Sequence, residues 1–239
     1  MSADLLVERE RSAGLALDRR ALLETFRLRL ATPRDEMAVD RLRQRAYATA
    51  VNFTLHEPGA LRTRNDPPGS VVLMLTSGDT LAATVRLNVV ASRARASLEL
   101  EADASVPADW FPGLIIGRGA TDPTFRGLGS MAFLVSLGVA AARDAGQNCA
   151  IATQYEGAPH FNAMRRAGWQ RKSVGSERMA RTLAKSIGPL NLVYIRDALF
   201  ADSVAHSAQV HADIRRVVRA SSIEREVGAA LEKAKTATG

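Results

Sequence analysis

The chain has 239 residues, of which 46% are hydrophobic and 24% charged, a composition typical of a globular protein rather than a disordered one. Its single cysteine, Cys149, excludes an intramolecular disulfide framework and favours a reducing, cytoplasmic location. No apolar run approaches the roughly 18 residues that cross a bilayer, so we expect no membrane span. The formal net charge of +7 is compatible with nucleic acid, a phosphorylated cofactor or an acidic protein partner.

The first half of the chain predicts a terminal extension, a strand, a helix and a hairpin. Residues 1–23 form a charged, partly helical extension without the apolar core of a signal peptide. Apolar and basic residues alternate over the strand Thr25–Ala31. A helix starts after Thr32, because a Thr-x-x-Asp box and a proline at the first helical position follow. Two strand-like runs, Ser70–Thr76 and Thr80–Ala91, flank a Ser-Gly-Asp turn and form a hairpin.

The second half predicts a βαβ unit. Its strands cover Leu114–Thr121 and Gln147–Thr153, and an apolar helix over about Gly129–Ala145 joins them, so the strands are parallel neighbours. We therefore expect an α/β fold in the broad sense, a mixed α+β sheet with helices on both faces. The remaining predicted elements are a short helix (about Pro159–Ala167), one or two strands of which the clearest is Leu190–Arg196, and a helical region (Asp202–Lys235).

The loop Phe125–Ser130, with the sequence Phe-Arg-Gly-Leu-Gly-Ser, is the strongest candidate for function. Its glycines let the backbone turn tightly and approach a ligand. The N–H groups and the dipole at the start of the following helix favour an anion, usually phosphate. Arg126 adds a full positive charge. The residues from Gly127 onward also fit the dinucleotide-binding fingerprint formally, but residues 122–126 separate them from the preceding strand, which that fingerprint should follow directly. A plain glycine turn between strand and helix is the other alternative.

Two stretches resemble motifs of the GNAT acyltransferases. Thr121–Leu134 is similar to their pyrophosphate-binding motif, and Arg166–Trp169 is similar to their Ala-Gly-Phe/Trp tail. The resemblance implies a GNAT-like domain over 24–200 and a helical C-terminal extension over 201–239. It also implies a donor, either coenzyme A (as acyl-CoA) or the acyl-phosphopantetheine arm of a carrier protein, without a metal. The cofactor-binding residues that it implies are Thr121, Arg126, Gly127, Leu128, Gly129 and Ser130.

The resemblance also places the pantetheine arm between the two strands of the βαβ unit. Gly117 and Gly119 lie in the first of these strands and are suited to a β-bulge that separates the pair. Met131 departs from the motif, since the family prefers a small residue there, and this side chain is expected to affect how closely the donor approaches.

The implied reaction is attack of an amine on a thioester carbonyl, which requires a base and benefits from an acid. Where many GNAT enzymes carry a tyrosine, this chain has Met164. Three residues that follow the second strand are candidate replacements: Tyr155, Glu156 and His160. His160 could titrate near neutral pH. A partly exposed histidine at a helix start and a surface glutamate are the alternative interpretations.

A looser similarity links the chain to acyl-homoserine-lactone synthases and N-acyl amino acid synthases. It rests on Arg43-Gln44-Arg45-Ala46-Tyr47, on Arg86-Leu87 and on Arg118, while Ile115 stands where those synthases have glutamate. Arg86 and Arg118 lie on apolar strands and either bind a substrate carboxylate or pair with Glu99 or Glu101. The predicted function is N-acyl transfer from acyl-CoA or acyl carrier protein to a small amine, such as an amino acid.

A non-catalytic domain that binds an acyl thioester as a sensor or interaction module is the competing hypothesis. The C-terminal stripe Ile214, Val217 and Val218 could be a homodimer surface or could pack on the chain's own core. The four histidines and the cysteine show no metal-ligand spacing. Aromatic residues do not interleave with a basic patch, so the sequence does not favour nucleic acid as a partner.

Overall fold

The computed structural model describes residues 21–49, 53–55, 61–100, 106–155, 161–173, 183–186 and 190–238. Its strands are β1 (Phe26–Leu30), β2 (Phe53–Leu55), β3 (Val71–Ser77), β4 (Thr80–Val90), β5 (Gly113–Thr121), β6 (Cys149–Tyr155), β7 (Gln170–Ser173), β8 (Leu183–Ser186) and β9 (Leu190–Arg196). Its α-helices are α2 (Glu36–Ala48), α3 (Arg93–Leu100), α4 (Ser130–Asp144), α5 (Phe161–Arg166), α6 (Phe200–Val210), α7 (Ala212–Val217) and α8 (Ala220–Thr238).

Seven strands form one mixed sheet in the order β1-β3-β4-β5-β6-β9-β7, and β2 pairs with β8 in a separate ribbon. The predicted hairpin is β3 and β4, which pair antiparallel. The predicted βαβ unit is also confirmed, because β5 and β6 pair in parallel and α4 connects them.

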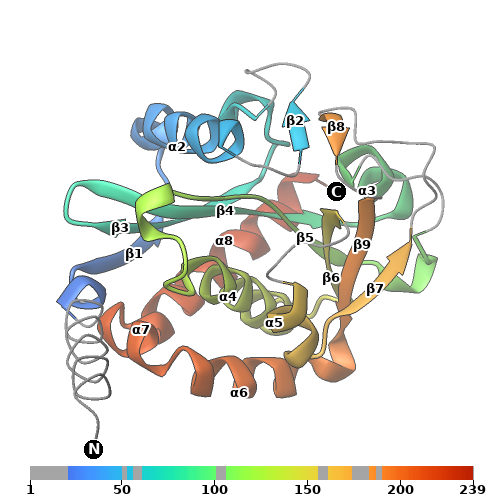
Figure 1. Cartoon of the computed structure of the whole chain (residues 1–239). Coiled ribbons are helices and arrows are strands. Elements are labelled where there is room, and N and C mark those ends of the chain that lie inside the picture. The colour runs from blue at the N-terminus through green and yellow to red at the C-terminus, as the bar shows by residue number, and fades with distance from the viewer. Residues whose placement is uncertain are drawn as a thin grey trace, which may run out of the picture.

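Helices cover both faces of the sheet, as predicted (Figure 1). On one face α2 contacts β4 and β5, and α3 contacts β4. On the other face α4 lies against β4 and β5, and α8 lies against β1, β3 and β4. Alternate residues of each strand therefore enter different clusters: Leu114 belongs to the main core under α4, whereas Ile115 packs with Trp110 on the opposite face.

Helix α4 lies close to the sheet at Gly138. A Cβ atom at this position would lie 2.6 Å from Cδ1 of Ile116 and 3.0 Å from Cδ2 of Leu87. Since real Cβ atoms do not approach neighbours so closely, the glycine permits the short distance between helix and sheet. This packing fixes the start of α4, where the candidate loop ends.

The C-terminal helices share the main core. Ile214 and Val218 are 4% and 7% exposed, and Leu231 of α8 is fully buried in the same cluster. Most of the apolar stripe that could have served a dimer therefore packs inside the chain, while Val217 is partly exposed. None of the helices in the described ranges is long and apolar enough to cross a membrane.

Four observed elements had no predicted range. The segment expected to be irregular after β4 contains helix α3, β2 pairs with β8, and β7 lies at the sheet edge beside β9. In helix α3 polar and apolar residues alternate over Arg93–Leu100, a period of two that indicates a strand rather than a helix.

Candidate active site

The loop between β5 and α4, residues 122–129 and hereafter the donor loop, turns at two left-handed glycines. Gly127 has φ 80° and Gly129 has φ 83°, a region that favours glycine. Gly129 is the residue immediately before α4, so the first N–H groups of this helix have no acceptor within the helix. The hydroxyl of Ser130 is buried, and no group in the described ranges hydrogen-bonds to it. These groups fit the phosphate oxygens that the sequence predicts here.

Asp122 holds the beginning of the donor loop. Its carboxylate accepts hydrogen bonds from the backbone N–H and the hydroxyl of Thr124, at 3.0 and 2.7 Å. Its other oxygen lies 2.8 Å from a guanidinium nitrogen of Arg45 on α2. Burial alone would raise the pKa of Asp122, but the Thr124 hydrogen bonds and the charges of Arg45 and Arg126 together hold this pKa below its usual value.

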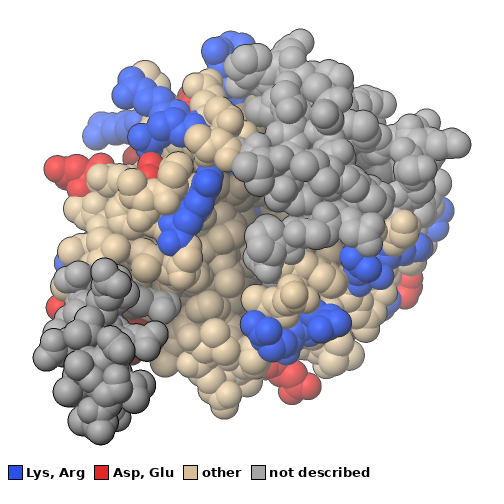
Figure 2. Space-filling model, in the orientation of Figure 1, with Lys and Arg blue, Asp and Glu red and all other residues tan. Residues whose placement is uncertain are grey.

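Arg126 bridges the donor loop to the end of α2. Its guanidinium donates to the backbone oxygen of Ala46 at 3.3 Å and to the hydroxyl of Thr49 at 2.8 Å. The side chain is exposed, so it retains access to a ligand at the loop. Figure 2 shows Lys and Arg side chains over α2 and α5 on this face, and the exposed arginines of these two helices are Arg41, Arg45, Arg165 and Arg166.

The predicted β-bulge is present in β5. The register between β4 and β5 shifts between Thr84 and Arg86, so that two residues of β5 lie opposite one residue of β4. Arg118, inside this bulge, has φ 54°. The parallel ladder between β5 and β6 covers Gly113–Ile115 only, and beyond it both strands continue without pairing to each other. The two strands therefore separate toward the donor loop.

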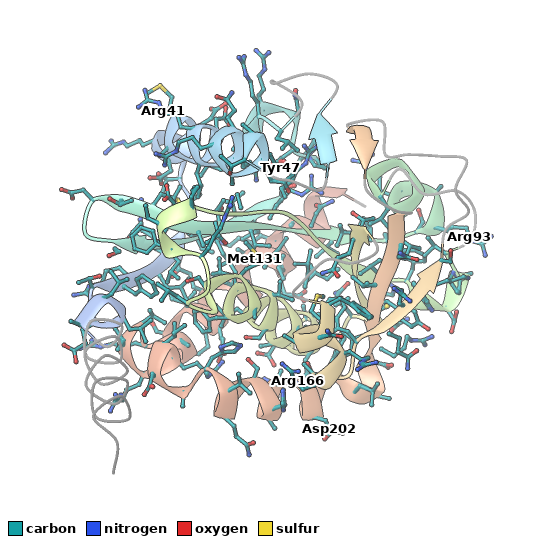
Figure 3. All side chains as sticks on the ribbon, viewed as in Figure 1. Arg41, Tyr47, Arg93, Met131, Arg166 and Asp202 are labelled. Carbon is teal, nitrogen blue, oxygen red and sulfur yellow. The ribbon has the colours of Figure 1, made fainter. Side chains whose placement is uncertain are left out.

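Met131 occupies space beside the separated strand. A Cβ atom at Gly119 would lie 2.9 Å from the sulfur of Met131, so this side chain packs directly on the backbone of β5 (Figure 3). Met131, which departs from the expected motif, thus fills space between Gly119 of β5 and the start of α4.

Arg43, Arg86 and Arg118 converge on Asp66, and we call these four residues the arginine cluster. The distances from their guanidinium nitrogens to the Asp66 carboxylate are 2.9, 3.4 and 3.9 Å, respectively. The Arg43 side chain is fully buried, and those of Arg86 and Asp66 are 6% exposed. Burial, followed by the charge of Arg86, lowers the pKa of Arg118.

The arginine cluster combines the two arginines predicted from the strands with Arg43 of the Arg-x-x-x-Tyr element. Tyr47 of the same element lies one turn further along α2 (Figure 3). The alternative partners Glu99 and Glu101 have no described side chain. Asp66 was missed because it follows an asparagine and precedes two prolines, a pattern that indicates only a turn.

Of the predicted acid–base residues, Tyr155 is the one whose backbone the structure describes. Tyr155 ends β6, but its side chain is not described, and Glu156 and His160 lie outside the described residues. Met164, at the place of the family tyrosine, is 5% exposed. The side-chain amide of Gln154 donates to its sulfur at 2.8 Å. Gln154 is a buried polar residue near this place that sequence reasoning did not single out.

His211, between α6 and α7, lies against the donor loop and was likewise not assigned a role. Its Cε1 and Nδ1 atoms are 3.6 and 3.7 Å from the position of a Cβ atom at Gly129. The ring also packs edge-on against Phe133, with 6.1 Å between ring centroids. The sequence carries no local signal for this contact, because it joins segments about 80 residues apart.

No protein-family model matches the sequence, and no curated protein matches it. Solved structures do match. The N-acyl amino acid synthase FeeM from uncultured soil microbes superposes with a TM-score of 0.55 at 14% identity, covering 77% of this chain and 97% of that one. The CoA-dependent acyl-homoserine lactone synthase MesI gives 0.50 at 12% identity, covering 78% and 95%. A protein of Salmonella typhimurium, assigned as an acetyltransferase and solved with acetyl-CoA, gives 0.50 at 14%, covering 72% and 94%.

These matches are consistent with the architecture of this chain. Its mixed sheet contains a parallel pair of strands that separate beside the glycine loop and the start of α4. At such low sequence identity the agreement concerns the fold. The chain therefore has the fold of the GNAT acyltransferase superfamily.

Proposed function

We propose that the protein is an N-acyltransferase that moves an acyl group from a pantetheine thioester to a small amine carrying a carboxylate, such as an amino acid. The observation that carries the proposal is the start of α4, where two left-handed glycines and the buried Ser130 hydroxyl surround helix N–H groups that have no acceptor within α4. A diphosphate or phosphate satisfies all of these groups at once, since each of them donates hydrogen bonds to an anion.

The donor is acyl-CoA or an acylated carrier protein, both of which supply a thioester whose carbonyl carbon is activated toward amines. The amides of Gly127, Gly129 and Ser130 would hold its phosphate, and Arg126 would add a charged contact from the exposed side of the loop. Beyond the loop, the separated part of β5 offers backbone groups to the pantetheine arm, because β6 does not use them there.

The acceptor carboxylate is assigned to the arginine cluster. Three guanidiniums converge on the Asp66 carboxylate in this largely buried group of residues. Two nitrogens of Arg43, Nε and Nη2, are buried with no hydrogen-bond partner in the described ranges. Buried cations need compensation, and a second carboxylate brought by the acceptor would supply it.

Proton handling is proposed for the end of β6. The amine must lose a proton as it attacks, and the leaving thiolate gains stability from a donor. Tyr155, Glu156 and His160 follow β6 directly, and His160 is suited to accept the proton near neutral pH. Replacement of His160 by alanine and of Tyr155 by phenylalanine should each lower kcat; full turnover by both variants would contradict these roles.

A direct test measures thiol release from acyl-CoAs of increasing chain length with a panel of amino acids as acceptors. Ser130→Ala should raise the KM for the donor, because it removes a hydroxyl donor from the anion site. Ser136→Ala is the matched control, since its hydroxyl lies later on α4 and donates to the backbone oxygen of Phe133. Equal KM values for the two variants would count against the donor site.

A thioester-binding sensor is the second candidate, and one observation favours it. The buried Met164 and its hydrogen bond from Gln154 fill the place where many GNAT enzymes carry the tyrosine that protonates the thiolate. Calorimetry with CoA and acyl-CoA, combined with the thiol-release assay, separates the candidates, because a sensor binds these ligands without releasing thiol in the presence of any acceptor.

A further inference from the structure

The C-terminal helices place a histidine against the donor loop. The chain passes from α6 into α7 at His211, whose backbone N–H donates to Ser207 and whose backbone oxygen accepts from Arg215, both at 2.9 Å. These bonds and the burial of Ile214 fix the backbone of the junction. The imidazole consequently has a defined position, with its Cε1–Nδ1 edge toward Gly129.

The imidazole lies beside the last residue of the donor loop and the first turn of α4. Cε1 of His211 is 3.6 Å from the place of a Cβ atom at Gly129, which is ordinary van der Waals contact for a side chain that is absent there. On its other side the ring meets Phe133, one turn into α4. His211 therefore supports the first turn of the helix whose N–H groups form the proposed anion site.

Burial and nearby charge both disfavour the protonated form of the ring. Burial, then the nearby His206 of α6 and Arg215 of α7, lower the pKa of His211. Arg215 is itself paired with Glu224 of α8 at 2.7 Å, and α4 contributes the uncharged Gly129 and Phe133. No described residue hydrogen-bonds to the ring nitrogens, so the ring is not committed to another partner.

We propose that His211 is a positioning residue for the donor loop and that its protonation strengthens the binding of the donor's diphosphate. The inference rests on the donor site proposed above. A diphosphate at the start of α4 places negative charge near the ring and favours imidazolium, so donor binding takes up a proton. By the same linkage, the donor binds more tightly as the pH falls through the titration range of His211.

The test uses the full chain and 3′-dephospho-CoA. The diphosphate of this ligand is strongly acidic and keeps its charge between about pH 5.5 and 7.5, and the ligand lacks the 3′-phosphate group that would titrate in this range. Calorimetry gives its Kd at both pH values. For the wild type we expect Kd to be roughly fivefold lower at pH 5.5, or about 1 kcal/mol. His211→Gln should show the same Kd at both pH values. His206→Gln should keep the pH dependence but shift it to higher pH, because it removes one of the charges that lower the pKa of His211.

Proton uptake provides a second measurement that requires no variant. The wild type should take up a fraction of a proton on binding near pH 6, measured from binding heats in two buffers with different ionisation enthalpies. A wild-type Kd independent of pH, or a pH dependence that survives in His211→Gln, would overturn the role of His211 while the donor site stands. Absence of binding at either pH would overturn the donor site and this inference together.

Discussion

Replacement of Asp66 tests the arginine cluster most directly. The Asp66 side chain is 6% exposed, and the fully buried Arg43 donates to it at 2.9 Å. Removing one partner of a buried ion pair costs about 3–5 kcal/mol, because it leaves the other charge uncompensated. Asp66→Asn keeps the shape of the side chain but removes its charge. We therefore expect the free energy of unfolding to fall by about 3–5 kcal/mol.

Urea unfolding followed by circular dichroism measures this loss. Asp144→Asn is the matched control, because Asp144 and its partner Arg143 are 43% and 42% exposed, and exposed pairs contribute about 0–1 kcal/mol. Combining Asp66→Asn with Arg43→Met should recover part of the loss, since the uncompensated charge is then removed as well. A loss for Asp66→Asn no larger than that of the control would refute the reasoning.

Three further predictions concern packing, pH and donor access. Gly138→Ala should lower the free energy of unfolding by about 1–2 kcal/mol because its Cβ would overlap Cδ1 of Ile116. Adding Ile116→Val should recover part of this loss in urea unfolding, and a more stable single variant would contradict the packing. Asp122 has a lowered pKa, so its stabilisation is complete above its unfolded pKa of about 4 and is lost as the pH falls toward the folded value. Unfolding measured from pH 6 to pH 2 should therefore depend less on pH in Asp122→Asn than in the wild type, and identical slopes would contradict this. Met131→Ala should lower the Kd for CoA severalfold in calorimetry by opening the space beside Gly119, whereas Met37→Ala, whose side chain is 68% exposed in the wild type, should not change it. An unchanged Kd in both variants would show that Met131 does not limit access.

Local sequence patterns predicted those parts of the fold that depend on neighbouring residues. The β3–β4 hairpin, the βαβ unit and the glycine turns each lie within a short stretch, so periodicity and turn chemistry specify them. The capping box is one such case: the backbone N–H of Thr32 donates to the Asp35 carboxylate at 2.8 Å. In the structure, however, this box opens a short 3₁₀ turn that continues into α2.

The site was less predictable because its contacts join distant segments. Arg86 and Arg118 were identified as unusual from their apolar strands, but their shared carboxylate, Asp66, lies in a loop that local patterns describe only as a turn. Arg126 was expected beside the phosphate, and its hydrogen bonds to the end of α2 depend on how that helix packs over β5. The contact of His211 with Gly129 likewise arises only after α6 and α7 pack against α4.

The backbone of β5 at Arg118 has a consequence for engineering. A non-glycine residue at φ 54° carries a conformational cost of about 1 kcal/mol or more, which glycine would not have. Selection for heat resistance alone would therefore tolerate Arg118→Gly, whereas selection for the acyl transfer proposed above would retain the guanidinium beside Asp66. Variants evolved for thermostability should be sequenced at this codon before their loss of activity is attributed to changes elsewhere.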